Sequence, residues 1–157
     1  MKEGVFLDLF SGSGGVARAV RTEGFKAVEW DRKFGPDFDL TIRQHVARLK
    51  RMIRDGDVIG ACLAPPCSSF SIARDRTLMI RSRSHPWGLP GLPELEQLKV
   101  DEGNSCLRVT LELIRCLNLF RVPWAWENPL TSRMWLTPQA QKIMSLSCVD
   151  DIVCDFA

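Results

Sequence analysis

The chain has 157 residues, of which 45% are hydrophobic and 25% are charged, and its formal net charge is +2. These values are ordinary for one soluble globular domain, and the small net charge does not by itself indicate a nucleic-acid-binding protein. No apolar run approaches the roughly 18 residues of a membrane span. The first residues also lack the apolar segment and cleavage site of a secretory signal.

Six cysteines are spread along the sequence without a C-x-x-C pair, and the two histidines, His45 and His85, stand alone. We therefore expect no bound metal. Free thiols fit a reducing environment. The expected location is intracellular, in the cytoplasm of a prokaryote or a phage-infected cell, or in the nucleus of a eukaryote.

The first 64 residues alternate between two kinds of pattern. Short apolar runs bounded by turn residues predict strands at 4–10, 25–30 and 57–64. Helical spacing predicts a helix at 15–24 that ends at Gly24, and a second at 42–56 with Thr41 as its N-cap.

Residues 65–100 are rich in Pro, Gly, Ser and Arg, and predict a long functional loop. The predicted elements that follow are an amphipathic helix at 103–120, a strand at 122–129, a short helix at 137–146 and a last strand at 149–156. Strands that alternate with helices predict an α/β fold: a Rossmann-like, doubly wound, mostly parallel sheet with helices on both faces. We expect a single domain over residues 1–157.

The first strand runs into a glycine-rich turn, DLFSGSGG, which permits close approach of a ligand to a helix N-terminus. It is not the complete G-x-G-x-x-G fingerprint. The second strand ends in Glu29 and Trp30, an acid suited to ribose hydroxyls and a ring suited to an adenine. Together these features favour an adenosine-bearing cofactor, with NAD and S-adenosylmethionine both open.

Two features of the segment after the third strand have alternative interpretations. Cys67 follows two prolines, and is either a nucleophile on a rigid loop or a small apolar residue at a strand end. Four arginines fall within residues 74–83, and form either a solvated loop or a set of phosphate contacts.

Taken in order, several segments resemble the DNA cytosine-5 methyltransferase family. DLFSGSGG is similar to its cofactor loop, PPCSSFS to its nucleophile loop, and ENP to the block usually written Glu-Asn-Val; EWD and DLT fit two weaker blocks. The resemblance extends from Val5 to about Pro129. It implies the class I methyltransferase fold and transfer of a methyl group from S-adenosylmethionine to carbon 5 of a flipped cytosine in DNA.

The resemblance also implies roles for individual residues. Cys67 would add to carbon 6 of cytosine, Glu127 would contact the ring nitrogen and the exocyclic amine, and Asn128 would brace the Cys67 loop. Glu127 is expected to be buried among tryptophans. The implied cofactor-site residues are Phe10, Gly12, Ser13, Gly15, Glu29, Trp30, Asp39, Leu40 and Pro66. The implied substrate-binding residues are Ser68, Ser69, Ser71, Arg74 and Arg76.

Two departures from the family pattern leave alternatives open. Pro129 stands where valine is usual, and removes a backbone donor. The arginine-bearing block and target-recognition region of the family are not seen, so we expect the N-terminal catalytic part of an enzyme. The alternatives are a non-catalytic module that binds a cofactor or nucleic acid, and an RNA cytosine-5 methyltransferase. An amino-methylating enzyme fits less well, because its loop carries an aromatic residue in place of Cys67.

Overall fold

A computed structural model of the protein describes residues 4–154. These residues form two compact units. Unit 1 comprises residues 4–66 and 105–127, and unit 2 comprises residues 67–104 and 128–154. The single domain expected from the sequence stays a prediction.

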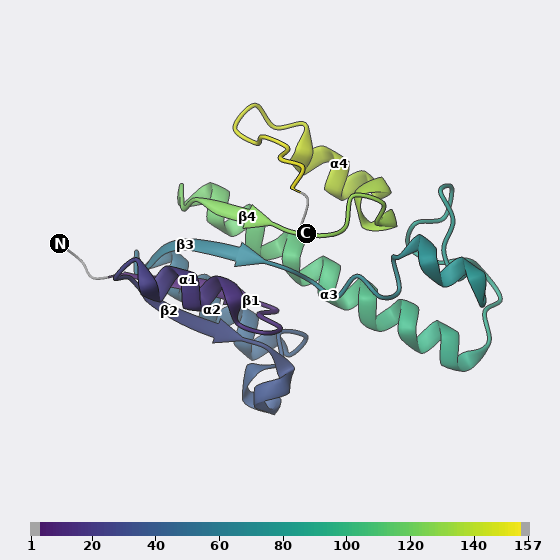
Figure 1. Cartoon of the computed structure of the whole chain (residues 1–157), viewed down its shortest axis with the longest axis horizontal. Helices are drawn as coiled ribbons and strands as arrows, with labels where there is room; N and C mark the ends of the chain where they lie inside the picture. Colours follow the sequence, from purple (N-terminus) through teal and green to yellow (C-terminus); the bar gives the residue numbers. More distant parts are fainter. Residues whose placement is uncertain (1–3, 155–157) are drawn as a thin grey trace. The chain divides into compact units, whose positions relative to one another are not determined.

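Unit 1 is built on a parallel sheet of four strands in the order β2-β1-β3-β4 (Figure 1). The strands are β1 (Val5–Leu9), β2 (Lys26–Trp30), β3 (Val58–Leu63) and β4 (Trp124–Trp126). In the register, Asp8 lies opposite Glu29 on one side and Cys62 on the other. This sheet confirms the predicted α/β, Rossmann-like architecture.

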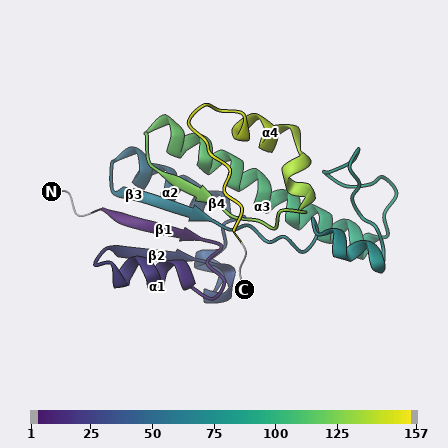
Figure 2. The same ribbon diagram turned by 45° about the horizontal axis from the view of Figure 1, so that its top comes forward.

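Helices cover both faces of this sheet. Helix α1 (Gly15–Thr22) lies on one face, and α2 (Arg43–Arg54) lies on the other beside the second half of α3 (Glu94–Leu119) (Figures 1 and 2). Each pair of consecutive parallel strands is connected by a segment that contains a helix, as in right-handed βαβ units.

The core of unit 1 lies between the strands and the α2–α3 layer. Helix α2 buries Val46, Leu49 and Ile53 at a spacing of three and four residues, which is the apolar stripe of an amphipathic helix. The strands contribute Leu7, Leu9 and Leu63, and α3 contributes Leu113, Ile114 and Leu117, all at most 1% exposed. Full burial of each such side chain contributes about 2 kcal/mol to folding.

Unit 2 contains the first half of α3, two 3₁₀ turns at Ile72–Arg76 and Arg133–Leu136, and α4 (Pro138–Met144). Its apolar core is small, with Phe70, Ile80, Val100, Met134 and Ile143 buried. Hydrogen bonds of two arginines, Arg81 and Arg133, connect its segments.

Two helix starts differ from the prediction. Helix α3 begins at Glu94, not at residue 103, because Pro93 starts the helix and acids occupy the first turn. Helix α2 has Ile42 as its N-cap, without a side-chain bond. Thr41 does not cap it, because its hydroxyl donates to Asp39 Oδ1 at 2.7 Å.

The predicted strand at 149–156 is wrong for the part that the structure describes. Residues 149–154 form no strand, and Ile152 and Val153 are 81% and 69% exposed. Alternating apolar residues form a strand only where a neighbouring strand accepts their hydrogen bonds, and this segment has no such neighbour among residues 4–154. Residues 155 and 156 lie outside the described residues.

Candidate functional site

Three motif segments of the sequence follow the carboxyl ends of parallel strands in unit 1. The glycine-rich turn follows β1, Ala64–Pro66 follows β3, and Glu127 follows β4. Backbone hydrogen bonds join these strand ends: Ala64 N donates to Leu9 O at 3.0 Å, and Glu127 N donates to Leu63 O at 2.9 Å. Ligands of open α/β sheets bind at this edge.

The glycine-rich turn is held open by backbone conformation and by an acid. Phe10, Gly12 and Gly14 all have positive φ, at 58°, 51° and 71°, so this turn depends on glycine at two of its positions. Asp31 Oδ2 accepts a hydrogen bond from Gly12 N at 2.9 Å. The hydroxyl of Ser11 is buried and has no hydrogen-bond partner among the described residues.

Glu29 approaches this turn from β2. A Cβ atom at position 14 would lie 2.3 Å from Glu29 Oε1, so only glycine allows the carboxylate to lie this close to the loop. The other carboxylate oxygen accepts a hydrogen bond from Arg21 Nη1 at 3.0 Å. Glu29 is thus a partly exposed acceptor beside the loop.

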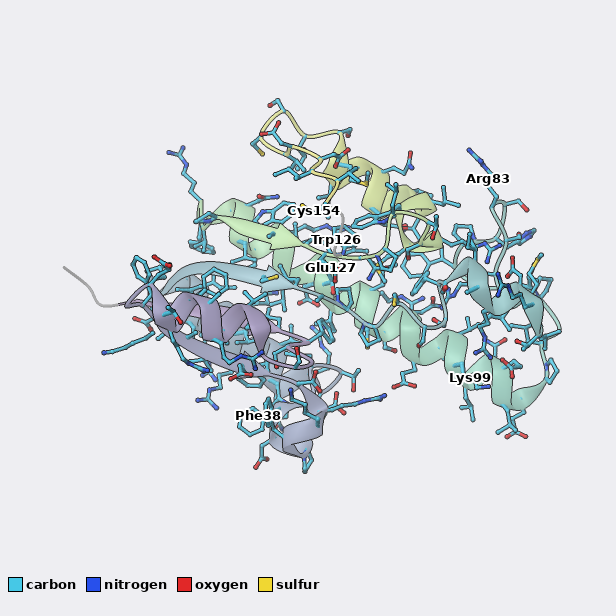
Figure 3. The ribbon with its side chains drawn as sticks, in the orientation of Figure 1. Phe38, Arg83, Lys99, Trp126, Glu127 and Cys154 are labelled. Carbon is cyan, nitrogen blue, oxygen red and sulfur yellow. The ribbon has the colours of Figure 1, made fainter. Side chains whose placement is uncertain are left out.

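Trp30 is only 2% exposed. Its ring packs against Phe38 and His45, with centroids 5.7 and 5.6 Å away, and Arg48 lies over it (Figure 3 labels Phe38). The indole nitrogen is buried and has no hydrogen-bond partner in the described part of the chain. Stacking of an adenine on this ring therefore requires the neighbours of Trp30 to move.

The remaining predicted cofactor residues also lie in unit 1. Ser13 and Gly15 are exposed in the glycine-rich turn, and Pro66 is exposed after β3. Leu40 is 3% exposed and belongs to the core. Asp39 accepts hydrogen bonds from the backbone N–H and hydroxyl of Thr41 through Oδ1, which shapes the turn before α2.

Asp8 is a site residue that the sequence analysis missed. It is 2% exposed, and its Oδ2 accepts a hydrogen bond from Ala17 N in the first turn of α1 at 2.9 Å. Burial raises the pKa of Asp8, an effect that the Ala17 hydrogen bond opposes and the charge of Glu29 reinforces. The sequence feature that could have identified Asp8 is an acidic residue inside the apolar run of β1.

Glu127 is exposed, which corrects the expected burial among tryptophans. Figure 3 shows it directly after Trp126 at the end of β4. Trp124 and Trp126 are half-buried neighbours in the strand, and Trp124 Nε1 donates to Asn118 Oδ1 at 2.7 Å. The strand therefore presents the carboxylate of Glu127 to solvent at the sheet edge.

Cys67 begins a tight turn in unit 2. Its carbonyl oxygen accepts hydrogen bonds from Phe70 N and Ser71 N, both at 2.9 Å, and the residue is half-buried. Ser71 Oγ accepts from Ala73 N and caps the next 3₁₀ turn. Ser69 is 6% exposed and Ser68 is exposed. Of the three predicted phosphate-binding serines, Ser68 has the most accessible side chain.

Arg81 stabilises the Cys67 turn from the protein interior, a role that the sequence analysis missed. Its side chain is fully buried and stacks on Phe70, with the guanidinium carbon 3.7 Å from the ring centroid. Its donors reach Ser69 O, Ser69 Oγ, Pro86 O, Val100 O and Asn104 Oδ1 at 2.8–3.0 Å. Burial lowers the pKa of Arg81 to about 10, so it stays charged at neutral pH, solvated by neutral acceptors.

The two arginines predicted to bind substrate differ in their surroundings. Arg74 Nη2 donates to Glu96 Oε2, and Lys99 shares the same carboxylate. These partners, Lys99 first, lower the pKa of Glu96. Arg76 is exposed. Of the pair, Arg76 is the side chain that is available to a phosphate.

Arg133 connects the segment after Asn128 to the Cys67 turn within unit 2. Its guanidinium forms a bidentate ion pair with Asp75, at 2.9 and 2.5 Å, and its backbone N–H donates to Phe70 O at 3.0 Å. The hydrogen bonds from Arg133 lower the pKa of Asp75. Asn128 is half-buried at the start of this segment.

The buried cysteines are poor nucleophiles. Burial raises the pKa of Cys62 and of Cys106 to about 11, and also raises the pKa of Cys116. Their thiols remain protonated at neutral pH, whereas the thiolate is the reactive form. Of the cysteines next to the motif segments, Cys62 is buried and Cys67 is half-buried.

None of the helices within residues 4–154 combines the length and the apolar character needed to cross a bilayer. The same residues contain no group of three or more His, Cys, Asp or Glu side chains arranged to hold a metal ion.

The chain was also compared with known proteins in three ways. No protein-family model, no curated protein and no solved structure matches it.

Proposed function

We propose that the protein is an S-adenosylmethionine-dependent methyltransferase that acts on carbon 5 of cytosine in DNA through a covalent bond to Cys67. One observation supports this proposal most directly. The glycine-rich turn and Glu127 both follow strand ends at one edge of a parallel sheet, and the strand between them, β3, ends at Leu63, from which the chain continues through Pro65 and Pro66 to Cys67. In chain order, each of the three family-like motifs therefore comes after the carboxyl end of a parallel strand, where ligands of open α/β sheets bind.

The residues of the glycine-rich turn fit the proposed cofactor. The Glu29 carboxylate beside Gly14 is an acceptor for ribose hydroxyl groups, which donate in pairs to such an acid. The unpartnered hydroxyl of Ser11 offers a further polar contact beneath the turn. Exposed Gly12, Ser13 and Gly15 leave the loop backbone accessible to the amino-acid part of the molecule.

The chemistry explains why a thiol and a carboxyl group are both needed. Carbon 5 of cytosine is a weak nucleophile while the ring is aromatic. A bond from Cys67 Sγ to carbon 6 moves the π electrons to carbon 5 and toward ring nitrogen N3. In its protonated form, Glu127 donates a hydrogen bond to N3 and accepts one from the exocyclic amine, which stabilises the charge that develops on the ring. S-adenosylmethionine, when bound, supplies an electrophilic methyl group to carbon 5.

The remaining steps release the methylated base and restore the free enzyme. After methylation, carbon 5 carries both a methyl group and its original hydrogen. Loss of that hydrogen as a proton to solvent restores the double bond and breaks the Cys67–carbon 6 bond. The thiolate of Cys67 is regenerated, so no external oxidant or reductant is consumed.

A mechanism-based trap tests the proposal. Duplexes with 5-fluorocytosine in every four-base context are incubated with the protein and S-adenosylmethionine, because fluorine at carbon 5 cannot leave as a proton. We expect an adduct on the Cys67 peptide in mass spectrometry, absent in Cys67→Ser and present in Cys148→Ser. A matching pool of RNA is tested in the same way, and an adduct formed with RNA alone would identify an RNA methyltransferase. The absence of an adduct with both pools would overturn the proposal.

Cofactor binding is tested separately by calorimetry with S-adenosylmethionine. We expect Glu29→Gln to weaken binding by at least about ten-fold, because it removes a charged acceptor from the ribose hydroxyls. Glu23→Gln, an exposed position after α1, serves as the control. Binding without any trapped adduct would instead support a non-catalytic cofactor-binding module.

A further inference from the structure

A basic groove lies between α2 and the second half of α3, within unit 1. It has a volume of about 500 Å³ and is lined by Arg43, Ala47, Lys50, Arg51, Arg54, Glu112, Arg115, Cys116, Leu119 and Phe120. Five of these residues are basic and one is acidic. The formal net charge of the whole chain is only +2, so positive charge is concentrated on this surface.

The pattern of α2 explains the basic side of the groove. Val46, Leu49 and Ile53 face the core, and the side of the helix that adjoins this stripe carries Arg43, Lys50, Arg51 and Arg54 at intervals of seven, one and three residues. At 1.5 Å per residue, this row is about 16 Å long.

Most of this charge is not neutralised within the protein. Glu112 accepts from Arg43 Nη1 at 2.7 Å and from Lys50 Nζ at 2.9 Å, and these hydrogen bonds, Arg43 first, lower its pKa. Within residues 4–154, Arg54 forms an ion pair with Asp55 next to it, where both side chains are more than half exposed. The side chains of Arg51 and Arg115 have no ion-pair partner in the described part of the chain.

The composition of the groove points to a phosphate backbone. Four of its five basic residues are arginines, whose planar guanidinium groups bind phosphate in a bidentate manner. With a volume of about 500 Å³, the groove has room for part of one strand and not for a duplex. Phe120, 40% exposed at the end of α3, offers an aromatic surface on which a base can stack.

We propose that the α2–α3 groove binds single-stranded nucleic acid through its phosphates. The end of the groove at Arg54 and Phe120 precedes β3 and β4, where these parallel strands begin. The glycine-rich turn and Glu127 lie at the opposite, carboxyl edge of the sheet. The groove is therefore a separate site from the proposed methyltransferase centre, and its test needs no methyl transfer.

Fluorescence anisotropy with a labelled dT12 oligonucleotide tests the proposal over a series of salt concentrations. We compare Arg51→Gln/Arg115→Gln with Arg121→Gln/Lys142→Gln, which removes two exposed charges outside the groove. The groove variant should bind at least ten-fold more weakly. It should also reduce the slope of log K against log salt by about 1.4, because two single-strand phosphate contacts are lost. The control variant should keep the slope of the unmodified protein.

Phe120→Leu separates stacking from charge. It should weaken dT12 binding at least about five-fold and leave the salt slope unchanged. Three results would overturn the proposal: equal losses in the groove and control variants, tighter binding of a 12-base-pair duplex than of dT12, or equal binding of a hexaglutamate peptide.

Discussion

Arg81 donates hydrogen bonds to both the carbonyl oxygen and the hydroxyl of Ser69, each at 3.0 Å. Ser69 stands two residues after Cys67, and the same guanidinium stacks on Phe70. The shape of the Cys67 turn therefore depends on a fully buried charge whose hydrogen-bond acceptors are neutral. Such a group is tolerated only when its donors are satisfied.

Replacement of Arg81 by methionine should destabilise unit 2 by more than about 3 kcal/mol. The substitution retains much of the apolar volume and leaves buried acceptors such as Pro86 O without a donor. Urea unfolding gives the size of the loss, and hydrogen exchange of residues 67–104 locates it. Arg83→Met is the control, because Arg83 is exposed and extends outward from the loop in Figure 3. Its effect should stay within about 0.5 kcal/mol, and equal losses in both variants would contradict the role of Arg81.

Gly103 lies in α3 directly against this cluster. A Cβ atom there would lie 2.2 Å from Ser69 Oγ and 3.0 Å from Arg81 Nη2. Helix propensity alone predicts that Gly→Ala stabilises a helix by up to about 1 kcal/mol. We expect the opposite sign for Gly103→Ala, a loss of about 1–3 kcal/mol from overpacking.

Gly15→Ala is the matched control for Gly103→Ala. Gly15 is the first residue of α1, and nothing lies closer than 3.8 Å to the position of its Cβ atom. In urea unfolding, this variant should be neutral or slightly stabilised. A stabilised Gly103→Ala protein would show that α3 does not pack closely on the Ser69 hydroxyl.

These contacts mark the limit of what the sequence predicted. The strands and the first two helices were predicted because apolar runs and amphipathic spacing are local patterns. Arg81 was grouped with three neighbouring arginines, since its acceptors lie up to 23 residues away and no local pattern identifies them. The start of α3 was missed because the loop before it is rich in Pro and Gly, and because Gly103 interrupts the helical pattern between its two halves.

The candidate site, like the fold, could be predicted from the sequence only in part. Glu29 was a candidate because it lies near the end of a predicted strand, and in the structure its carboxylate lies beside the glycine-rich turn. The burial of Trp30 and the exposure of Glu127 depend on which elements pack over each strand end. That packing is a property of the tertiary structure, and a single sequence does not contain a local signal for it.

The buried carboxyl group of Asp8 should make stability depend on pH. Its pKa is raised, mainly by burial, so the folded state retains a proton that the unfolded chain loses near the ordinary value of about 3.9. The free energy of unfolding of the unmodified protein, relative to that of Asp8→Asn, should therefore fall as pH rises from 3 through the raised pKa. Each unit of pKa shift corresponds to about 1.4 kcal/mol.

Asp8→Ala provides the comparison for this measurement. It removes the same carboxyl group and should show the same pH trend against the unmodified protein. It should be less stable than Asp8→Asn at every pH, by about 1 kcal/mol, because Ala17 N loses its acceptor. A difference between the unmodified protein and Asp8→Asn that stays constant from pH 3 to pH 7 would contradict the raised pKa.

The six cysteines should separate into two classes when the folded protein is alkylated with iodoacetamide at pH 8. Cys148 and Cys154 are exposed and Cys67 is half-buried, so these three should react. Cys62, Cys106 and Cys116 combine burial with raised pKa values.

Peptide mapping by mass spectrometry measures each rate. For Cys62 and Cys106, whose pKa is about 11, the reaction should be more than about a hundred-fold slower than for an ordinary thiol, because so little thiolate is present at pH 8. In 8 M urea all six rates should become similar, which controls for local sequence effects. Rapid labelling of Cys62 in the folded protein would show that β3 is accessible to the reagent. Protection of Cys67 equal to that of Cys62 would remove the accessible thiol that the proposed covalent chemistry requires.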